Sequence, residues 1–299
     1  MHVVDYLRYN LSLVLHLLVQ IQFRTHFEQD AQMSKKPYKE LVGALLHISG
    51  WSRPDIRYAV VQCAKFAQNP GYKMWIAAKR ILRYLYKTKH KHLRIGRQNG
   101  GEMGFPLVHV EGDPGPYLND PANQSELLVF CDSGWAADVD DRRSQGGYCT
   151  FLQGNLLSWE SKKSSKVATS TATAEIYALD RGSKEAIYLQ GILEDLGYFV
   201  IPDVLGDNTT ANRLAEFPKF SNQTKHVHVA EMFVHEQVAK GNLRLAYVRT
   251  QFNVADIFTK PLSPIVFKRL RDVLLGISSY DEAEEETIIA KMAKLESKY

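Results

Sequence analysis

Four acidic side chains have the residue types and the predicted positions to form a catalytic or metal-binding group: Asp132, Glu175, Asp207 and Asp256. Asp132 and Asp207 each follow a short apolar run that is typical of a buried strand. Ligands collect where the strands of an α/β sheet end, so we expect these two aspartates to share one sheet edge. Glu175 lies one turn into a predicted long helix and Asp256 opens the predicted last helix. The predicted topology brings both of them to the same edge.

The chemistry that fits such a group is the binding of divalent cations. Four converging carboxylates repel one another strongly unless hard cations neutralise them. Ligand sets made only of oxygen favour Mg²⁺ or Mn²⁺ over zinc. Two such ions can activate a water and stabilise the leaving oxygen of a phosphodiester. The alternative is four separate surface acids, because the chain has 33 Asp and Glu residues in all.

Three lysines lie between the third predicted strand and the long helix: Lys162, Lys163 and Lys166. They have the charge to hold the phosphates of a nucleic acid in a salt-sensitive way. A solvated basic turn is the alternative interpretation.

The elements that would position these groups follow one another after residue 126. Three runs with strand character lie at 127–131, 148–152 and 156–159, with turn residues between them. A long helix is predicted over 171–196. Later strands are predicted at 204–205 and 243–248, and later helices from 208, over 227–239 and from 254. This order predicts an α/β fold with a mixed five-stranded sheet, three antiparallel strands and then two parallel ones, flanked by helices.

The rest of the chain divides by composition. We predict an unassigned segment at 1–37, a helical segment at 38–97, a Gly- and Pro-rich linker at 98–125, the acid-bearing domain at 126–276 and a charged helical tail at 277–299. The helical segment reads as three short helices with a basic face. In it, Pro54 is expected to end one helix and Asp55 to cap the next.

The bulk properties exclude few classes of protein. The 299 residues are 45% hydrophobic and carry a net charge of +4, which is ordinary for a globular protein. Cys63, Cys131 and Cys149 have no metal-ligand spacing, so we expect reduced thiols in an intracellular protein. The longest apolar run, at 11–21, is too short to span a bilayer, and we expect no membrane segment.

Several motifs resemble the ribonuclease H domain of copia-type retrotransposon Pol polyproteins, and they occur in the same order. Segment 131–148 is similar to that family's first strand and hairpin, and 157–163 to its third strand and basic turn. Thr173-Ala174-Glu175-Ile176 resembles the start of the helix with the second acid, and Gly206-Asp207-Asn208-Thr209 the third-acid segment. Segments 224–227 and 255–262 complete the set. The resemblance implies the ribonuclease H-like fold.

The resemblance also implies a function. It carries the metal-binding and catalytic roles to Asp132, Glu175, Asp207 and Asp256, with two Mg²⁺ ions that Mn²⁺ can replace. The implied reaction is hydrolysis of the RNA strand of RNA/DNA hybrids, which leaves 3′-hydroxyl and 5′-phosphate ends. Lys225 and His226 are implied to lie near the substrate, although a plain helix start explains them equally well. The alternative function is an inactive retrotransposon remnant that serves at most as a nucleic-acid-binding or structural module.

A second resemblance covers the helical segment 38–97. Segments 37–46, 53–60 and 77–85 are similar to the region between polymerase and nuclease in the same polyproteins. The resemblance implies that 38–97 is a remnant of the reverse transcriptase thumb or connection. The paired aspartates of the polymerase do not occur in the sequence, so we expect no DNA synthesis. Other Pol segments are the expected protein partners, and a cytoplasmic virus-like particle or the nucleus is the expected location.

The sequence departs from that family at six positions, none of which is one of the four acids. Family members usually have Asp, Glu, Cys, Arg, Asp and His where this chain has, in order, Gly134, Thr173, Gly206, Gln223, His228 and Glu231.

Overall fold

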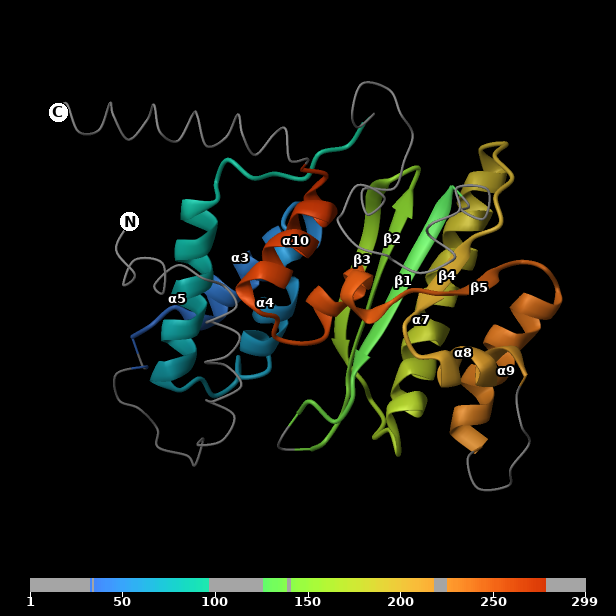
Figure 1. Cartoon of the computed structure of the whole chain (residues 1–299). Helices are drawn as coiled ribbons and strands as arrows, with labels where there is room; N and C mark the ends of the chain where they lie inside the picture. Colours follow the sequence, from blue (N-terminus) through green and yellow to red (C-terminus); the bar gives the residue numbers. More distant parts are fainter. Residues whose placement is uncertain (1–32, 34, 97–125, 139–140, 218–224, 278–299) are drawn as a thin grey trace.

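A five-stranded mixed sheet organises the second half of the chain in the computed structural model, which describes residues 33, 35–96, 126–138, 141–217 and 225–277 (Figure 1). In chain order its strands are β1 Leu127–Gly134, β2 Gln145–Leu152, β3 Asn155–Lys163, β4 Asp203–Gly206 and β5 Arg244–Tyr247. In space the order is β3-β2-β1-β4-β5. Strand β1 is therefore central and is buried along almost its whole length.

The strand directions confirm the predicted sheet. β1 pairs antiparallel with β2, and β2 antiparallel with β3. β1 pairs parallel with β4, and β4 parallel with β5. This is the sheet of three antiparallel and two parallel strands that the ribonuclease H-like fold requires.

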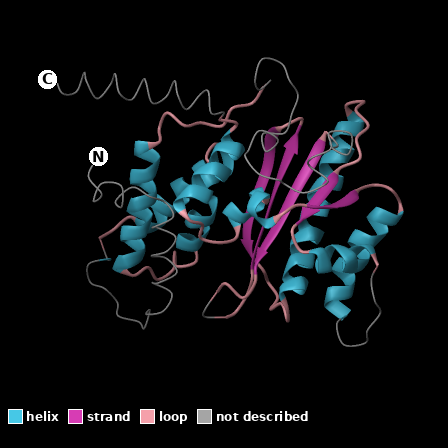
Figure 2. Cartoon of the chain, viewed as in Figure 1, coloured by secondary structure: helices cyan, strands magenta, loops and turns pink. Residues whose placement is uncertain are grey.

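Three helices cover one face of the sheet: α7 Thr171–Asp195, α8 Thr209–Glu216 and α9 Lys225–Ala239 (Figures 1 and 2). Ser170 caps the start of helix α7, and its side chain accepts a hydrogen bond from the Thr173 backbone N–H. The helix lies directly against β1, as Gly182 shows: a Cβ atom at this position would collide with Cys131 Sγ. The predicted long helix and the predicted cap at Asn208, whose side chain accepts from the Ala211 N–H, are both confirmed.

The opposite face packs against helices from both ends of the described chain. From the N-terminal side come α3 Tyr38–Trp51, η2 Pro54–Ile56, α4 Arg57–Ala64 and α5 Tyr72–Lys87, and from the C-terminal side η6 Thr250–Phe252, η7 Val254–Phe258 and α10 Pro264–Leu275. One apolar cluster joins them to the sheet, with Leu45 and Ile81 in the same core as Phe130 and Phe258. Trp159 of β3 adds a polar link by donating from Nε1 to the Ser49 carbonyl at 2.8 Å. The helical segment and the sheet therefore share one hydrophobic core.

The predicted last helix is wrong as a single element. The chain forms the short 3₁₀ helix η7 at Val254–Phe258, and α10 begins only at Pro264. Pro264 occupies the first helical turn and Ser263 caps it, so a new helix starts there and the earlier one does not continue. Asp256 consequently lies in a tight 3₁₀ turn that packs on the sheet.

The predicted capping role of Asp55 is also wrong. Helix α3 ends at Trp51, before Pro54, and Asp55 caps no helix. Its carboxylate instead accepts hydrogen bonds from Arg53 Nε at 2.9 Å and from the Tyr84 hydroxyl at 2.7 Å. Burial explains the difference, because a carboxylate removed from water needs strong donors and the guanidinium of Arg53 supplies two of them.

Three segments with predictions of their own lie wholly or mostly outside the part of the chain that the structure describes. The segment 1–32, the linker at 98–125 and the tail at 278–299 lie outside the described residues. Within the described part, none of the helices is long and apolar enough to cross a bilayer. All three cysteines are free thiols and are buried.

Candidate active site

The sheet register places Asp132 beside Asp207. In the parallel pairing of β1 with β4, Phe130 lies opposite Leu205. Asp132 follows Phe130 by two residues within β1, and Asp207 follows Leu205 by two residues, directly after the end of β4, so both aspartates lie at the same end of this strand pair. The sequence predicts one shared sheet edge for Asp132 and Asp207, and the parallel pairing of β1 with β4 is what brings them there.

Asp256 reaches the same place because η7 is fastened to the sheet. Asn253, which is fully buried, donates from Nδ2 to the Cys131 carbonyl at 2.9 Å, and its Oδ1 accepts from the Ala255 N–H at the start of η7. Ser161 Oγ on β3 donates to the Phe258 carbonyl at 2.6 Å. Gly147 allows the close contact, since a Cβ atom there would stand 2.6 Å from Phe258 Cβ.

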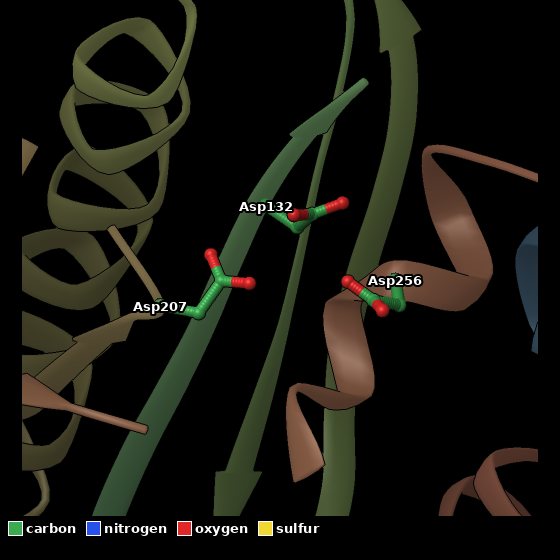
Figure 3. Close-up of side chains that lie close together, drawn as sticks. All are labelled: Asp132, Asp207 and Asp256. Carbon is green, nitrogen blue, oxygen red and sulfur yellow. The ribbon is translucent and has the colours of Figure 1, made fainter. Parts of the chain in front are cut away.

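Three carboxylates meet at this point and form what we call the acid triad: Asp132, Asp207 and Asp256. Each offers an oxygen atom, and these atoms lie within 4.8 Å of one another. Figure 3 shows the side chains converging on a common space from β1, from the end of β4 and from η7. Asp132 and Asp256 are buried, and Asp207 is half-buried.

The triad is electrostatically unfavourable without a cation. Burial, followed by the charge of Asp132, raises the pKa of Asp256 to about 8, although Lys260 opposes the rise. Burial and the charge of Asp132 also raise the pKa of Asp207. Both carboxylates therefore bind protons more readily than ordinary aspartates, as expected where like charges are held together.

Glu175 lies next to the triad but outside the group whose oxygens fall within 4.8 Å. It sits on α7 two turns before Gly182, and thus on the helix face that packs against β1. Burial, followed by the charges of Asp132 and Asp207, raises its pKa to about 10. The structure thus brings three of the four predicted acids into one group and places the fourth within electrostatic range.

The donor chemistry of the triad fits a hard divalent cation. Its ligand atoms are all carboxylate oxygens, and the three anionic groups meet in a buried position where a cation would relieve their repulsion. Among the described residues, no other group of acids, histidines or cysteines of this kind occurs. The prediction of a divalent metal is consistent with this geometry.

Sequence reasoning missed two neighbours of Asp132. The Thr259 hydroxyl donates to Asp132 Oδ2, and Lys260 Nζ lies 3.6 Å from Asp132 Oδ1 and 2.8 Å from Asp256 Oδ1. For Lys260 the sequence does contain a signal, because it follows Asp256 by four residues. At this spacing opposite charges pair on a helical turn.

The three predicted lysines of the basic turn line one cleft. Its volume is about 320 Å³, and residues of α7 such as Arg181 line it together with Lys162, Lys163 and Lys166. Ser133, the residue after Asp132 in β1, also lines the cleft, whereas none of the three triad aspartates does. The structure therefore brings the three lysines together with residues of α7 in one cleft.

The three lysines differ in their partners. Lys163 Nζ lies 2.6 Å from Asp138 and 2.8 Å from Asp141, so two carboxylates already neutralise its charge. Lys162 and Lys166 are exposed, and the Lys166 ammonium stands 5.9 Å from the centre of the Tyr177 ring. Lys162 and Lys166 are thus the better placed of the three to bind an anion.

The last two predicted site residues, Lys225 and His226, are in the first turn of α9. Their side chains lie outside the described residues, and so does that of His228.

Comparisons with known proteins agree with the motifs. No protein-family model matches the chain. It is 32% identical over 256 residues to the retrovirus-related Pol polyprotein from transposon TNT 1-94 of Nicotiana tabacum. This alignment covers 85% of this chain and 17% of that protein. The chain is 32% identical over 233 residues to the Pol polyprotein from transposon RE2 of Arabidopsis thaliana, covering 77% of this chain and 14% of that one.

Among solved structures, LC11-RNase H1 in complex with an RNA/DNA hybrid aligns with a TM-score of 0.35 and 18% identity, over 44% of this chain and 93% of that chain. The chain spans less than a fifth of the length of the two Pol polyproteins it matches.

Proposed function

The chain belongs to the retrovirus-related Pol polyproteins of copia-type transposons, and we propose that it is their ribonuclease H, a metal-dependent endonuclease for the RNA strand of RNA/DNA hybrids. The proposal applies to the segment of Pol that this chain represents and includes no DNA synthesis. Other segments of Pol are the proposed protein partners.

The observation that carries the proposal is the acid triad. Asp132, Asp207 and Asp256 come from three separate elements, and their oxygens nevertheless lie within 4.8 Å of one another. Burying three like charges costs free energy of folding. Asn253 and Gly147 nevertheless hold η7 against the sheet, and thereby keep Asp256 close to the other two acids. A fold under no functional demand would gain stability by placing neutral side chains there.

In the proposed mechanism the triad would hold Mg²⁺, or Mn²⁺ in its place, and Glu175 of α7 would be a further ligand. Two bound ions would supply an activated water and neutralise charge on the leaving oxygen. The chain's own part is orientation. Thr259 donates to Asp132 and fixes the direction of that carboxylate, and a Thr250 hydrogen bond does the same for Asp207.

The substrate would be held in the basic cleft. Lys162 and Lys166 are proposed to bind phosphates of the hybrid. Lys163, which pairs with Asp138 and Asp141, is proposed to order the turn that lies between Lys162 and Lys166. Lys225 and His226 are proposed as further contacts from α9.

The decisive experiment is cleavage of an end-labelled RNA/DNA hybrid by the purified chain with Mg²⁺, read on a denaturing gel. We expect RNA fragments with 3′-hydroxyl ends from the hybrid, and none from single-stranded RNA or duplex DNA. Asp132→Asn should lower the rate at least about 100-fold, because it removes an anionic ligand. Asp195→Asn, the same change at an exposed acid near the end of α7, should leave the rate unchanged.

Circular dichroism on each variant separates loss of activity from loss of fold. A folded native chain that fails to cleave the hybrid with Mg²⁺ or Mn²⁺ contradicts the proposal. If that chain still binds the hybrid, the alternative of an inactive nucleic-acid-binding remnant holds.

A further inference from the structure

Lys260, two residues after the end of η7, brings a positive charge into the acid triad. Its ammonium stands 2.8 Å from Asp256 Oδ1 and 3.6 Å from Asp132 Oδ1, so one side chain bridges two of the three acids. Its charge also opposes the raised pKa of Asp207 and of Glu175, which places all four acids within its electrostatic range.

The position of Lys260 follows from the local fold. The Lys260 N–H donates to the Asp256 carbonyl, and the neighbouring Thr259 binds Asp132 through its hydroxyl. The lysine therefore begins its side chain next to both carboxylates. Its side chain is about one-third exposed (34%), whereas those of Asp132 and Asp256 are 2% and 7% exposed, so the ammonium enters the triad from the solvent side.

We propose that Lys260 is a built-in counter-ion of the acid triad, which balances the carboxylates in the metal-free protein and is displaced toward solvent when a divalent cation binds. The inference rests on the proposed function, because it requires that the triad binds metal. Lys260 is a positioning residue in this scheme: its ammonium bridges Asp132 and Asp256 and keeps these two carboxylates gathered before the ion arrives.

The consequence is a competition between two cations for the same oxygens. An ammonium a few ångströms from a divalent ion repels it, and even a water-like dielectric makes this repulsion worth about a tenfold change in affinity. Removing the charge of Lys260 should thus tighten metal binding while it destabilises the metal-free protein. A purely structural lysine would weaken the fold without tightening the binding of metal.

The test measures binding of Mg²⁺ alone, without substrate, by isothermal titration calorimetry and by the shift of the melting temperature. We expect Lys260→Gln to bind Mg²⁺ about tenfold more tightly than the native chain. We also expect Lys260→Gln to melt at a lower temperature than the native chain in EDTA. Addition of Mg²⁺ should then raise its melting temperature by more than it raises that of the native chain. Lys260→Arg keeps the charge and should restore the native affinity. Lys240→Gln removes the lysine of another i,i+4 pair, that with Glu236, and should change neither quantity.

An unchanged or weaker Mg²⁺ affinity in Lys260→Gln overturns the proposal while cleavage by the native chain still supports the proposed function. If neither protein binds Mg²⁺, the counter-ion role fails, and the hybrid-cleavage assay reports separately on the function. If Lys260→Gln does not fold in EDTA, recovery of native circular dichroism with Mg²⁺ supports the proposal. Failure to recover at millimolar Mg²⁺ overturns it.

Discussion

Two buried acidic sites of this molecule differ in how their charge is balanced. Asp55, between α3 and α4, receives two hydrogen bonds from Arg53, with Nε at 2.9 Å and Nη2 at 2.7 Å, and a third from the Tyr84 hydroxyl. The acid triad gathers three carboxylates around the single ammonium of Lys260, which reaches two of them. One site pairs a single anion with its own cation, and the other leaves three anions undercompensated.

The difference separates a structural role from a functional one. A buried carboxylate with a bidentate guanidinium and a hydroxyl needs nothing more from its surroundings. A buried cluster with an excess of negative charge needs a further cation to be stable. The first site holds the helical segment together, and the second is where ligand chemistry is expected.

The largest expected effect on stability comes from breaking the balanced site. Arg53→Met leaves Asp55 buried without its cation, which should lower the free energy of unfolding by about 3–5 kcal/mol. Urea denaturation followed by circular dichroism measures it. The double variant Arg53→Met/Asp55→Leu removes both charges and should recover most of the loss. A single-variant cost below about 1 kcal/mol would mean that the pair is dispensable.

The same kind of change in the triad should have the opposite sign. In EDTA at pH 7, Asp256→Asn should raise the free energy of unfolding by about 1–2 kcal/mol, because it removes a buried carboxylate whose charge the site disfavours. The comparison fails if the variant is less stable than the native chain under these conditions. Excess Mg²⁺ should reverse the order, since only the native triad keeps all three anionic ligands.

The pH dependence of the Asp256→Asn effect sharpens this prediction. The pKa of Asp256 is raised from 3.8 to about 8 in the folded chain, so the folded state holds its proton more tightly than the unfolded state. Stability should therefore be lost as pH rises from about 4 toward 8. The gain from Asp256→Asn should then be small at pH 4 and larger at pH 7.5, measured in EDTA. A gain that shrinks over this range would contradict the assigned repulsion.

Tyr84→Phe tests the third donor of the balanced site. It removes one hydrogen bond to Asp55 and leaves the guanidinium in place, so we expect a loss of about 1–2 kcal/mol in the free energy of unfolding. Urea denaturation measures it, and the smaller cost relative to Arg53→Met is the expected ranking. Equal costs would mean that the hydroxyl, and not the charge, balances Asp55.

The smallest effect is expected at the basic cleft. Lys162→Gln and Lys166→Gln should each reduce the salt dependence of hybrid binding by about one unit of log–log slope. Lys163→Gln should change that slope less, because Asp138 and Asp141 already neutralise its charge. Fluorescence anisotropy with a labelled hybrid in Ca²⁺, over a series of salt concentrations, measures the slopes. Three equal slopes would show that the ion pairs of Lys163 open on binding.

Much of the fold could be predicted from the sequence because its signals are local. Alternating and continuous apolar runs marked β1, β2 and β3, and the helix over Thr171–Asp195 follows from apolar spacing and a serine cap. The misassigned elements are those in which local signals compete. The chain after Val254 has helical spacing, yet Ser263 and Pro264 start a new helix. Asp55 has the residue type of a cap but is used as a buried ion-pair partner.

The sequence by itself determined the residue types of the site: four acids, a basic turn and the strands that carry Asp132 and Asp207. The tertiary structure alone decided which of these groups meet. Asn253 and Gly147 bring Asp256 onto the sheet, two acids neutralise Lys163, and Lys260 enters the triad. The physical reason is range: periodicity and capping act over a few residues, whereas these contacts join segments that lie far apart along the chain and depend on the packing of the whole core.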